Sequence, residues 1–249
     1  KHVPHQLEEM KGIARGSGRS LDEILAVNAR TDMLVMGRAL APRKDNPGCT
    51  ALAMRGRAGG KPALALGQNW DWRQDLAKGI VVLRIKPDKG PRLVTFTEAG
   101  MVGKIGFNEH RLGTCLNFLS HATESPARGY GVPVHCLLRE VMACRTLEEA
   151  YKMVAWVPRC ASANFLLAQP GKGVEALDLE WTPTAVARIP LSGGLLVHTN
   201  HFKDPALAPG CPGQKGKSTL NRDATAAALA RALERKIGDP VARMKKVLT

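Results

Sequence analysis

Long apolar runs, aromatic residues and acidic residues are scarce in this sequence, and each scarcity removes a class of protein from consideration. Phe, Trp and Tyr make up 4% of the 249 residues, so the hydrophobic 44% consists mainly of aliphatic side chains. No stretch approaches the roughly 18 uninterrupted apolar residues of a membrane span. No charged and then apolar segment at the start has the pattern of a signal peptide. We therefore expect a globular core built from Leu, Val, Ala and Met.

Cysteine is present without the spacing that would indicate a metal or redox role. Six cysteines stand at positions 49, 115, 136, 144, 160 and 211, and no two of them form a C-x-x-C motif. This spacing argues against a zinc ribbon and against a dithiol redox site. A chain of this length does not need disulfide bonds to fold, so we expect free thiols, a reducing compartment and a cytoplasmic location.

Acidic residues are outnumbered, since 22 Asp and Glu stand against 36 Lys and Arg, which gives a formal net charge of +14. A surplus of this size suits an anionic partner, either a nucleic acid or a small molecule such as a coenzyme A thioester. The basic residues are spread along the chain, however, and no aromatic residues alternate with them as in proteins that stack single-stranded bases. We therefore expect a small-molecule substrate, no nucleic acid and no membrane partner.

Capping boxes and hairpin signals outline the secondary structure. Ser20 and Glu23 form a capping box that predicts a helix to about Met33, followed by a loop over residues 38–46. Thr146 and Glu149 form a second capping box that opens a helix over residues 146–156. Further helices are expected over residues 134–143, 218–237 and from 240 onwards, and hairpins over residues 50–66, 80–97 and 163–179. Runs of strands followed by runs of helices favour an α+β fold over alternating α/β units.

One stretch places a thiol at the start of an apolar strand, directly after a run of turn-forming residues. Cys49 follows Asp45-Asn46-Pro47-Gly48 and precedes Thr50-Ala51-Leu52. Pro47 restricts the backbone, and Gly48 has no Cβ, so a nucleophile can approach its carbonyl carbon closely. Taken alone, a cysteine in this position is more often a buried structural residue than a nucleophile.

Polar residues at the ends of apolar strands are the candidates for a site around Cys49. They are Asp71, Asn117, Asn164 and Asn200, with Arg222 early in a helix. Each alone has a structural explanation, as a turn acid, a hydrogen-bonded sheet amide or a solvated helix residue. His198 and His201 have the spacing of a metal pair, but no third ligand stands near them in sequence, so we expect no metal site.

A nucleophilic cysteine needs a base, an oxyanion stabiliser and a positive field. The sequence signals no Cys–His pair. If the Gly48–Cys49 bond is cut, the new α-amine of Cys49, with a usual pKa of about 8, can take the thiol proton. Asparagine side chains such as those of Asn117 and Asn164 can donate to an oxyanion or to substrate, and an acid and an arginine can orient the amine.

Four stretches resemble one known family and occur in its order. They are Gly48-Cys49-Thr50; Gly67-Gln68-Asn69-Trp70-Asp71-Trp72; Thr97-Glu98-Ala99-Gly100 through Gly103-Lys104-Ile105-Gly106-Phe107-Asn108; and Val197-His198-Thr199-Asn200-His201. With these motifs the sequence resembles the acyl-coenzyme A:6-aminopenicillanic acid (isopenicillin N) acyltransferase family of N-terminal-nucleophile hydrolases. The resemblance covers most of residues 5–235.

The resemblance implies a four-layer αββα sandwich and a precursor that cleaves itself before Cys49. The products would be a pro-segment or α chain of residues 1–48 and a β chain of residues 49–249, within one structural domain. Cys49 would be the nucleophile of both self-cleavage and turnover, with Asp71 as the acidic residue of the catalytic site and Asn200 in the oxyanion hole. Arg222 matches a family arginine near the nucleophile less closely.

The implied function is a self-processing acyltransferase or amide hydrolase. It needs no cofactor, and acyl-coenzyme A is a candidate co-substrate. The implied partners are a small-molecule amide or acyl-coenzyme A and, for each chain of the cut precursor, the other chain. Family members extend further at both ends, so we expect this chain to be truncated there.

Two other interpretations stay open. The protein could be an amidohydrolase of N-acyl amino acids or small peptides that does not use coenzyme A. It could also be a non-catalytic basic binding protein or an inactive fragment, and Cys49 would then be buried and inert.

Overall fold

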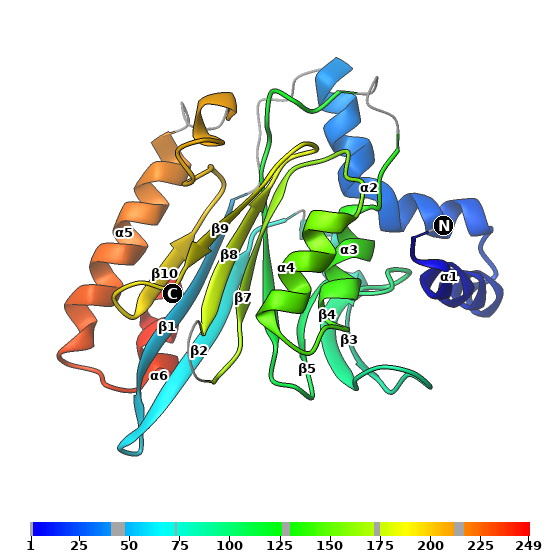
Figure 1. Ribbon diagram of the computed structural model, residues 1–249. Coiled ribbons are helices and arrows are strands. Elements are labelled where there is room, and N and C mark those ends of the chain that lie inside the picture. Colours follow the sequence, from blue (N-terminus) through cyan, green and yellow to red (C-terminus); the bar gives the residue numbers. More distant parts are fainter. Residues whose placement is uncertain (1, 41–47, 73, 126–129, 172–174, 212–216) are drawn as a thin grey trace.

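The computed structural model describes residues 2–40, 48–72, 74–125, 130–171, 175–211 and 217–249 (Figure 1). The turn residues Asp45, Asn46 and Pro47, which precede the expected nucleophile, lie outside the described residues. Gly48 and Cys49 lie within them.

The strands of the described residues form two antiparallel sheets. The smaller, three-stranded sheet has the order β10-β1-β2, from β10 (Leu195–His198), β1 (Cys49–Ala58) and β2 (Lys61–Trp70). The larger, seven-stranded sheet follows chain order: β3 (Ile80–Ile85), β4 (Leu93–Glu98), β5 (Ile105–Asn108), β6 (Gly113–Phe118), β7 (Ala163–Ala168), β8 (Ala176–Trp181) and β9 (Val186–Pro190). The predicted hairpins are confirmed, because β1 pairs with β2, β3 with β4 and β7 with β8.

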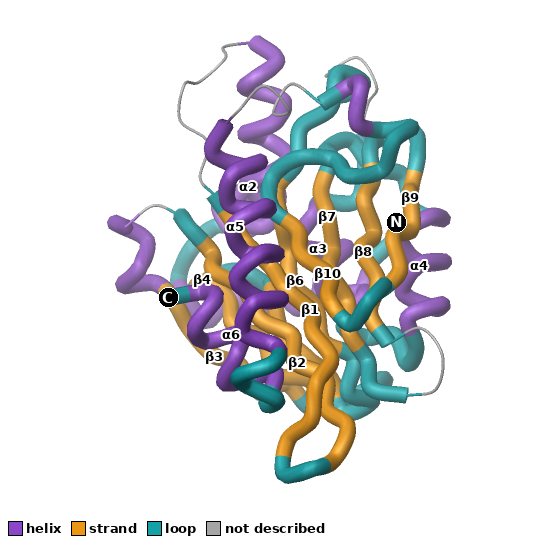
Figure 2. Tube along the Cα trace, turned by 90° about the vertical axis from the view of Figure 1, so that its left-hand side faces the viewer, coloured by secondary structure: helices purple, strands orange, loops and turns teal. Residues whose placement is uncertain are grey.

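Helices cover the outer faces of both sheets. The smaller sheet lies under α5 (Lys217–Glu234) and α6 (Pro240–Leu248), which stand in front of it in Figure 2. The larger sheet is covered from the other side by α1 (Pro4–Ser17), α2 (Leu21–Leu40), α3 (Val134–Val141) and α4 (Leu147–Trp156) (Figure 1). Within the described residues, the short 3₁₀ helices η1 (Gln74–Gly79) and η3 (Ala208–Gly210) lie in connections. The expected αββα sandwich is confirmed.

Strand β1 shows how the sequence produces these layers. Because side chains alternate along a strand, Leu52 and Met54 face α5 and α6, while Ala51 and Ala53 face the larger sheet. Each of the four is at most 1% exposed. Small alanines on the inner face let the two sheets approach closely, and each large aliphatic side chain on the outer face contributes about 1.5–3 kcal/mol through its burial. A third apolar cluster fills the space between the larger sheet and the helices α1 to α4.

The first capping box is confirmed, but the helix that it opens is longer than predicted. The Ser20 N–H donates to Glu23 Oε2 at 2.8 Å, and the Glu23 N–H donates to Ser20 Oγ at 3.2 Å. Helix α2 then continues to Leu40, past the predicted end at Met33 and into the predicted loop. The stretch contains no proline, and Gly37 weakens a helix by only about 1 kcal/mol. Val35 is buried in the core at 3% exposure, so packing extends the helix. The remainder of the predicted loop lies outside the described residues.

Other boundaries differ from expectation for local reasons. Helix α5 ends at Glu234 rather than near residue 237, and α3 ends at Val141. Strands β5 and β9 were not expected. A glycine in a strand resembles a turn in sequence, yet Gly106 is required in β5, because a Cβ there would lie 2.1 Å from the Val94 carbonyl oxygen.

The caps of the later helices agree with the sequence. Thr146 Oγ1 accepts from the Glu149 N–H at the start of α4, and Asp239 accepts from the Val241 N–H at the start of α6. Across the described ranges, no helix is both long and apolar enough to cross a membrane.

Candidate active site

Cys49 is the first residue of β1, and strand pairing brings residues from distant parts of the chain to it. On one side β2 places Trp70 opposite Cys49, so the next residue, Asp71, reaches the Gly48–Cys49 bond. The Asp71 N–H donates to the Gly48 carbonyl oxygen at 3.1 Å. On the other side β10 pairs His198 with Ala51. Cys49 stands two residues before Ala51, and Asn200 stands two residues after His198, just beyond the end of β10, so the pairing brings the two close together.

Asn200 contacts the backbone nitrogen of Cys49. Its Oδ1 accepts from the Cys49 N–H at 2.7 Å and from Arg222 Nη2 at 3.0 Å, while its Nδ2 donates to the Phe118 carbonyl at 2.9 Å. Since two donors face one side of the amide and a carbonyl faces the other, the orientation of the side chain is determined. With the bond before Cys49 intact, Asn200 thus presents an acceptor to residue 49. The oxyanion role expected for Asn200 needs a donor and stays a prediction.

Arg222 joins the same cluster from helix α5. Its Nη1 donates to the Cys49 carbonyl oxygen and, at 3.1 Å, to Thr50 Oγ1. A Cβ on Gly48 would lie 3.1 Å from both Cζ and Nη2 of Arg222. The guanidinium thus approaches the backbone of residue 48 closely. A glycine at this position leaves room for it, because glycine has no Cβ.

The Cys49 side chain is buried, at 5% exposure. Burial raises the pKa of its thiol above the usual value, and the carboxylate of Asp71 adds to the rise. The Asp71 N–H, the side chain of Gln68 and the charge of Arg222 oppose it. Because burial dominates, the thiol is protonated at neutral pH while the Gly48–Cys49 bond is intact, and turning it into a nucleophile requires a base.

A cavity of about 40 Å³ lies beside Cys49. Its walls are mainly apolar, with Trp70, Trp72, Leu116 and Phe118 among them, and helix α2 closes one side. At roughly 10–15 Å³ for each water-sized group, this volume holds about three such groups. Asp71, which is exposed, stands at the same cavity.

A buried charged cluster lies at this cavity, and none of its members was among the site residues expected from the sequence. Lys104, 3% exposed, donates from Nζ to Glu98 Oε1 at 2.6 Å, and Arg30 of α2 pairs with the same carboxylate. The Lys104 ammonium lies 3.4 Å from the ring centre of Trp70. Burial lowers the pKa of Lys104 to about 8, although Glu98 opposes the shift. The sequence did offer one indication of this cluster, because the family motif from Thr97 to Asn108 contains both Glu98 and Lys104.

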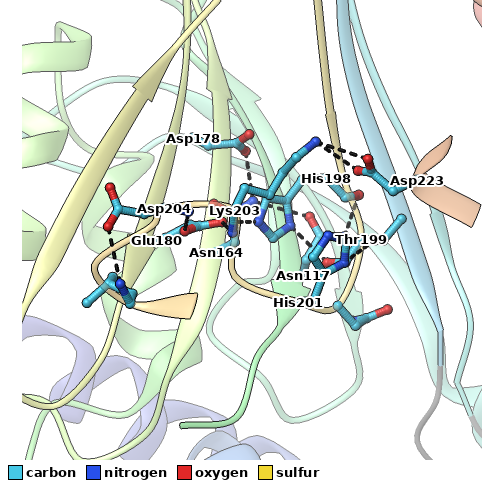
Figure 3. A network of polar contacts seen from close by, with 12 residues as sticks. Asn117, Asn164, Asp178, Glu180, His198, Thr199, His201, Lys203, Asp204 and Asp223 are labelled. Carbon is cyan, nitrogen blue, oxygen red and sulfur yellow. Dashed lines mark hydrogen bonds and ion pairs between the residues drawn. The ribbon is translucent and has the colours of Figure 1, made fainter. Parts of the chain in front are cut away.

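Asn117 and Asn164, the other two expected asparagines, do not line the cavity beside Cys49. Both are fully buried in the polar network of Figure 3. Asn117 Nδ2 donates to the His198 carbonyl at 3.2 Å, and Asn164 Nδ2 donates to Asp178 Oδ1 at 2.8 Å. In this arrangement they support the end of β10, and a direct role toward substrate stays a prediction.

His198 and His201, the spacing of which suggested a metal pair, have protein partners. His198 Nε2 lies 2.7 Å from Glu180 Oε1, and both side chains are fully buried (Figure 3). Burial by itself would lower the pKa of His198, but Asp178 and Glu180 outweigh it and raise the pKa. His201 Nδ1 lies 3.0 Å from Thr219 Oγ1. In the part of the chain that the structure describes, no three His, Cys, Asp or Glu side chains are grouped so as to hold a metal ion.

Comparisons with known proteins show what the chain as a whole is similar to. Residues 57–246 match the model of the family described as acyl-coenzyme A:6-aminopenicillanic acid acyl-transferase. That range contains Asp71, Asn200 and Arg222 and begins after Cys49. The 40 kDa form of the acyl-coenzyme A:6-aminopenicillanic-acid-acyltransferase of Emericella nidulans is 32% identical over 200 residues, which cover 80% of this chain and 52% of that protein. The chain thus spans about half the length of this curated relative.

Among solved structures, the Caenorhabditis elegans ortholog of N-acylethanolamine-hydrolyzing acid amidase has a similar fold. It superposes with a TM-score of 0.65 and 18% identity, over 81% of this chain and 86% of that chain. The penicillin V acylase of Agrobacterium tumefaciens is more distant, with a TM-score of 0.44 and 16% identity over 81% of this chain and 63% of that chain. The first likeness agrees with the N-terminal-nucleophile hydrolase architecture that the sequence predicts.

Proposed function

The chain belongs to the acyl-coenzyme A:6-aminopenicillanic acid acyltransferase family, and from this premise we propose that it is a self-processing cysteine enzyme that cleaves amides or transfers acyl groups. The observation that carries the proposal is the hydrogen bond of 2.7 Å from the Cys49 N–H to Asn200 Oδ1, beside the Gly48 carbonyl, which accepts from the Asp71 N–H. Both halves of the bond to be cut are thus held by groups from other parts of the chain.

Self-cleavage begins with attack of Cys49 Sγ on the carbonyl carbon of Gly48. A base takes the thiol proton, the carbonyl oxygen becomes an oxyanion, and the Asp71 N–H donates to it. The C–N bond then breaks as the nitrogen of Cys49 takes a proton, which leaves a thioester between Gly48 and Cys49. This step frees the α-amine of Cys49. Water then hydrolyses the thioester and releases the Gly48 carboxylate and the free thiol. Residues 1–48 and 49–249 are the two products.

Turnover reuses the same groups. The α-amine of Cys49, held by Asn200, takes the thiol proton, and the thiolate attacks the carbonyl carbon of the substrate. The leaving group departs with a proton, and the resulting acyl-cysteine passes its acyl group to water or to an amine. Arg222 keeps the cluster positive at the moment when negative charge develops. Loss of one donor to the oxyanion costs about 3 kcal/mol of barrier.

The proposed function has two versions, which differ in the acyl donor: an acyl-coenzyme A or an amide. The name of the Emericella relative supports transfer from acyl-coenzyme A to an amine, and the net charge of +14 suits an anionic donor. The nematode relative is named for the hydrolysis of N-acylethanolamines, which supports an amidohydrolase that does not use coenzyme A. Transfer of labelled acyl groups from acyl-coenzyme A to an amine, measured against release of free acid from an amide, separates the two.

Intact-mass measurement of the purified protein tests the proposal. We expect two chains cut between Gly48 and Cys49 in the wild type, and one uncut chain without turnover in Cys49→Ala. A Cys49→Ala protein that still separates into these two chains would exclude self-cleavage by this thiol. An uncut wild-type chain with a thiol that resists alkylation would favour the non-catalytic binding protein.

A further inference from the structure

The turn that carries Asn200 is attached to a buried carboxylate on a different strand. Glu180 of β8 is fully buried, and its two oxygens accept three hydrogen bonds from residues on both sides of Asn200. Oε1 lies 2.7 Å from His198 Nε2 and 2.7 Å from the Lys203 backbone nitrogen, and Oε2 lies 2.9 Å from the Asp204 backbone nitrogen. Figure 3 shows Glu180 between the His198 side and the Lys203–Asp204 side of this turn.

We propose that Glu180 is a positioning residue of the active site, which holds the turn of residues 198–204 so that Asn200 Oδ1 meets the nitrogen of Cys49. A fully buried carboxylate is costly unless several donors satisfy it, so the donors and the acid hold one another in place. The role rests on the proposed function, because it concerns the contact that would hold the α-amine of Cys49.

Other contacts of the turn also hold Asn200 in place. The His198 carbonyl accepts from Asn117 Nδ2, which ties the entry of the turn to β6. The Asn200 N–H donates to Thr219 Oγ1 at 2.9 Å. Thr219 precedes Arg222 by about one turn of α5, so the helix supplies both an anchor and the guanidinium. Asp223 of α5 also pairs with the Lys203 side chain at 2.9 Å, but Glu180 engages both ends of the turn.

A role in positioning differs from a role in stability alone in one measurable way. If Glu180 acts through Asn200, then its substitution has no further effect on the chemistry once the Asn200 side chain is removed. A purely structural residue would lower stability in both backgrounds and would leave the two effects on rate independent.

The experiment is a double-mutant cycle of Glu180→Gln and Asn200→Ala. The isosteric Glu180→Gln replaces one acceptor by a donor, so one of the three donors loses its partner. We expect kcat and the self-cleavage rate to fall by roughly 10- to 100-fold with little change in KM, the loss expected from a misplacement of about 1 Å. In the Asn200→Ala background the same substitution should change either rate by less than about twofold. A second full loss of rate in that background would overturn the proposal.

Two further variants keep the result interpretable. Glu180→Asp retains the buried charge, replaces Glu180→Gln if that protein does not fold, and should recover part of the rate. Glu140→Gln alters another buried carboxylate, which bonds to Gln6 of α1, and should leave both rates unchanged. A loss of rate in Glu140→Gln equal to that in Glu180→Gln would assign the effect to general destabilisation.

Hydrogen exchange at the backbone amide of residue 49 provides a readout that does not depend on activity. In the uncut Cys49→Ala chain, adding Glu180→Gln should speed this exchange about as much as adding Asn200→Ala does. Unchanged exchange would overturn the positioning role even if the protein proves to be an enzyme. Faster exchange in a protein that neither cleaves itself nor turns over would support the positioning role and count against the proposed function alone.

Discussion

Asn200 accepts a hydrogen bond of 2.7 Å from the backbone N–H of Cys49, although 151 positions separate the two residues. The contact follows from sheet register, because β1 and β10 are antiparallel and pair Ala51 with His198. It also fixes the direction of the Asn200 amide, with the oxygen toward Cys49 and the nitrogen toward the Phe118 carbonyl. Every group that contacts Asn200 therefore influences the nitrogen that would become the catalytic amine.

Arg222 should be needed as an arginine. Its guanidinium donates hydrogen bonds to the Cys49 carbonyl, Thr50 Oγ1 and Asn200 Oδ1 at once. A lysine ammonium cannot reach all three with the same geometry. We expect Arg222→Lys and Arg222→Ala to slow self-cleavage by roughly 10- to 100-fold, measured as the rate at which the uncut band disappears from a denaturing gel. Arg231→Ala, at an exposed position of the same helix, is the control. Wild-type cleavage by Arg222→Lys would show that charge alone is sufficient.

Gly48 should not tolerate a side chain during self-cleavage. A Cβ at this position would lie 3.1 Å from the guanidinium carbon of Arg222, so Gly48→Ala must displace either the arginine or the bond to be cut. We expect cleavage to slow by about tenfold or more, while thermal unfolding changes little. Gly12→Ala in α1, where no atom outside the adjoining helix backbone lies within 4 Å of the new Cβ, should cleave at the wild-type rate. Equal rates in the two variants would contradict the close-approach argument.

Asp32 should make folding depend on pH. Burial raises the pKa of its carboxyl from 3.8 to about 6, although the Val134 N–H and the Cys160 thiol donate to it. The folded state therefore binds the proton more tightly than the unfolded state, and the associated stability is lost as the pH rises from about 4 to about 6.

The measurement for Asp32 is urea unfolding of the wild type and Asp32→Asn across this pH range. Asparagine resembles the protonated acid and keeps an acceptor for Val134. Relative to Asp32→Asn, the wild type should lose about 2 kcal/mol of unfolding free energy between pH 4 and pH 6. This is the larger part of the roughly 3 kcal/mol that the whole pKa shift represents at about 1.4 kcal/mol per pKa unit. Comparing the two proteins at each pH removes the contribution of Asp178, the pKa of which burial also raises to about 6. Parallel curves for the two proteins would refute the assignment.

Leu52 tests the packing of β1 against the outer helices. It is fully buried in the cluster that includes Ala226 and Met244 of α5 and α6. We expect Leu52→Ala to lower the free energy of unfolding by about 2–5 kcal/mol, through lost transfer energy and the cavity that remains. Val82→Ala, at a position that is 62% exposed, should change it by less than about 0.5 kcal/mol. A small effect at Leu52 would mean that α5 and α6 do not pack on this sheet as described.

The sequence by itself determined the local features. Capping boxes predicted the starts of α2 and α4, because the side chains that satisfy the first N–H groups stand three residues apart. The main hairpins followed from turn residues between β-rich runs, and Cys49 could be located at a strand start. The motifs around Cys49, Asp71 and Asn200 also indicated the family and the layered fold. Each of these inferences depends on residues that are close in sequence.

Only the tertiary structure decided which distant groups meet. It extended α2 to Leu40 through core packing and made Gly106 part of a strand. It placed Asn117 and Asn164 in a buried polar network, and it brought Arg30 and Lys104 to the cavity beside Cys49. It also attached the turn around Asn200 to Glu180. Register and burial depend on how whole sheets and helices pack, and no local pattern in the sequence encodes the partner that a buried carboxylate or amide will find.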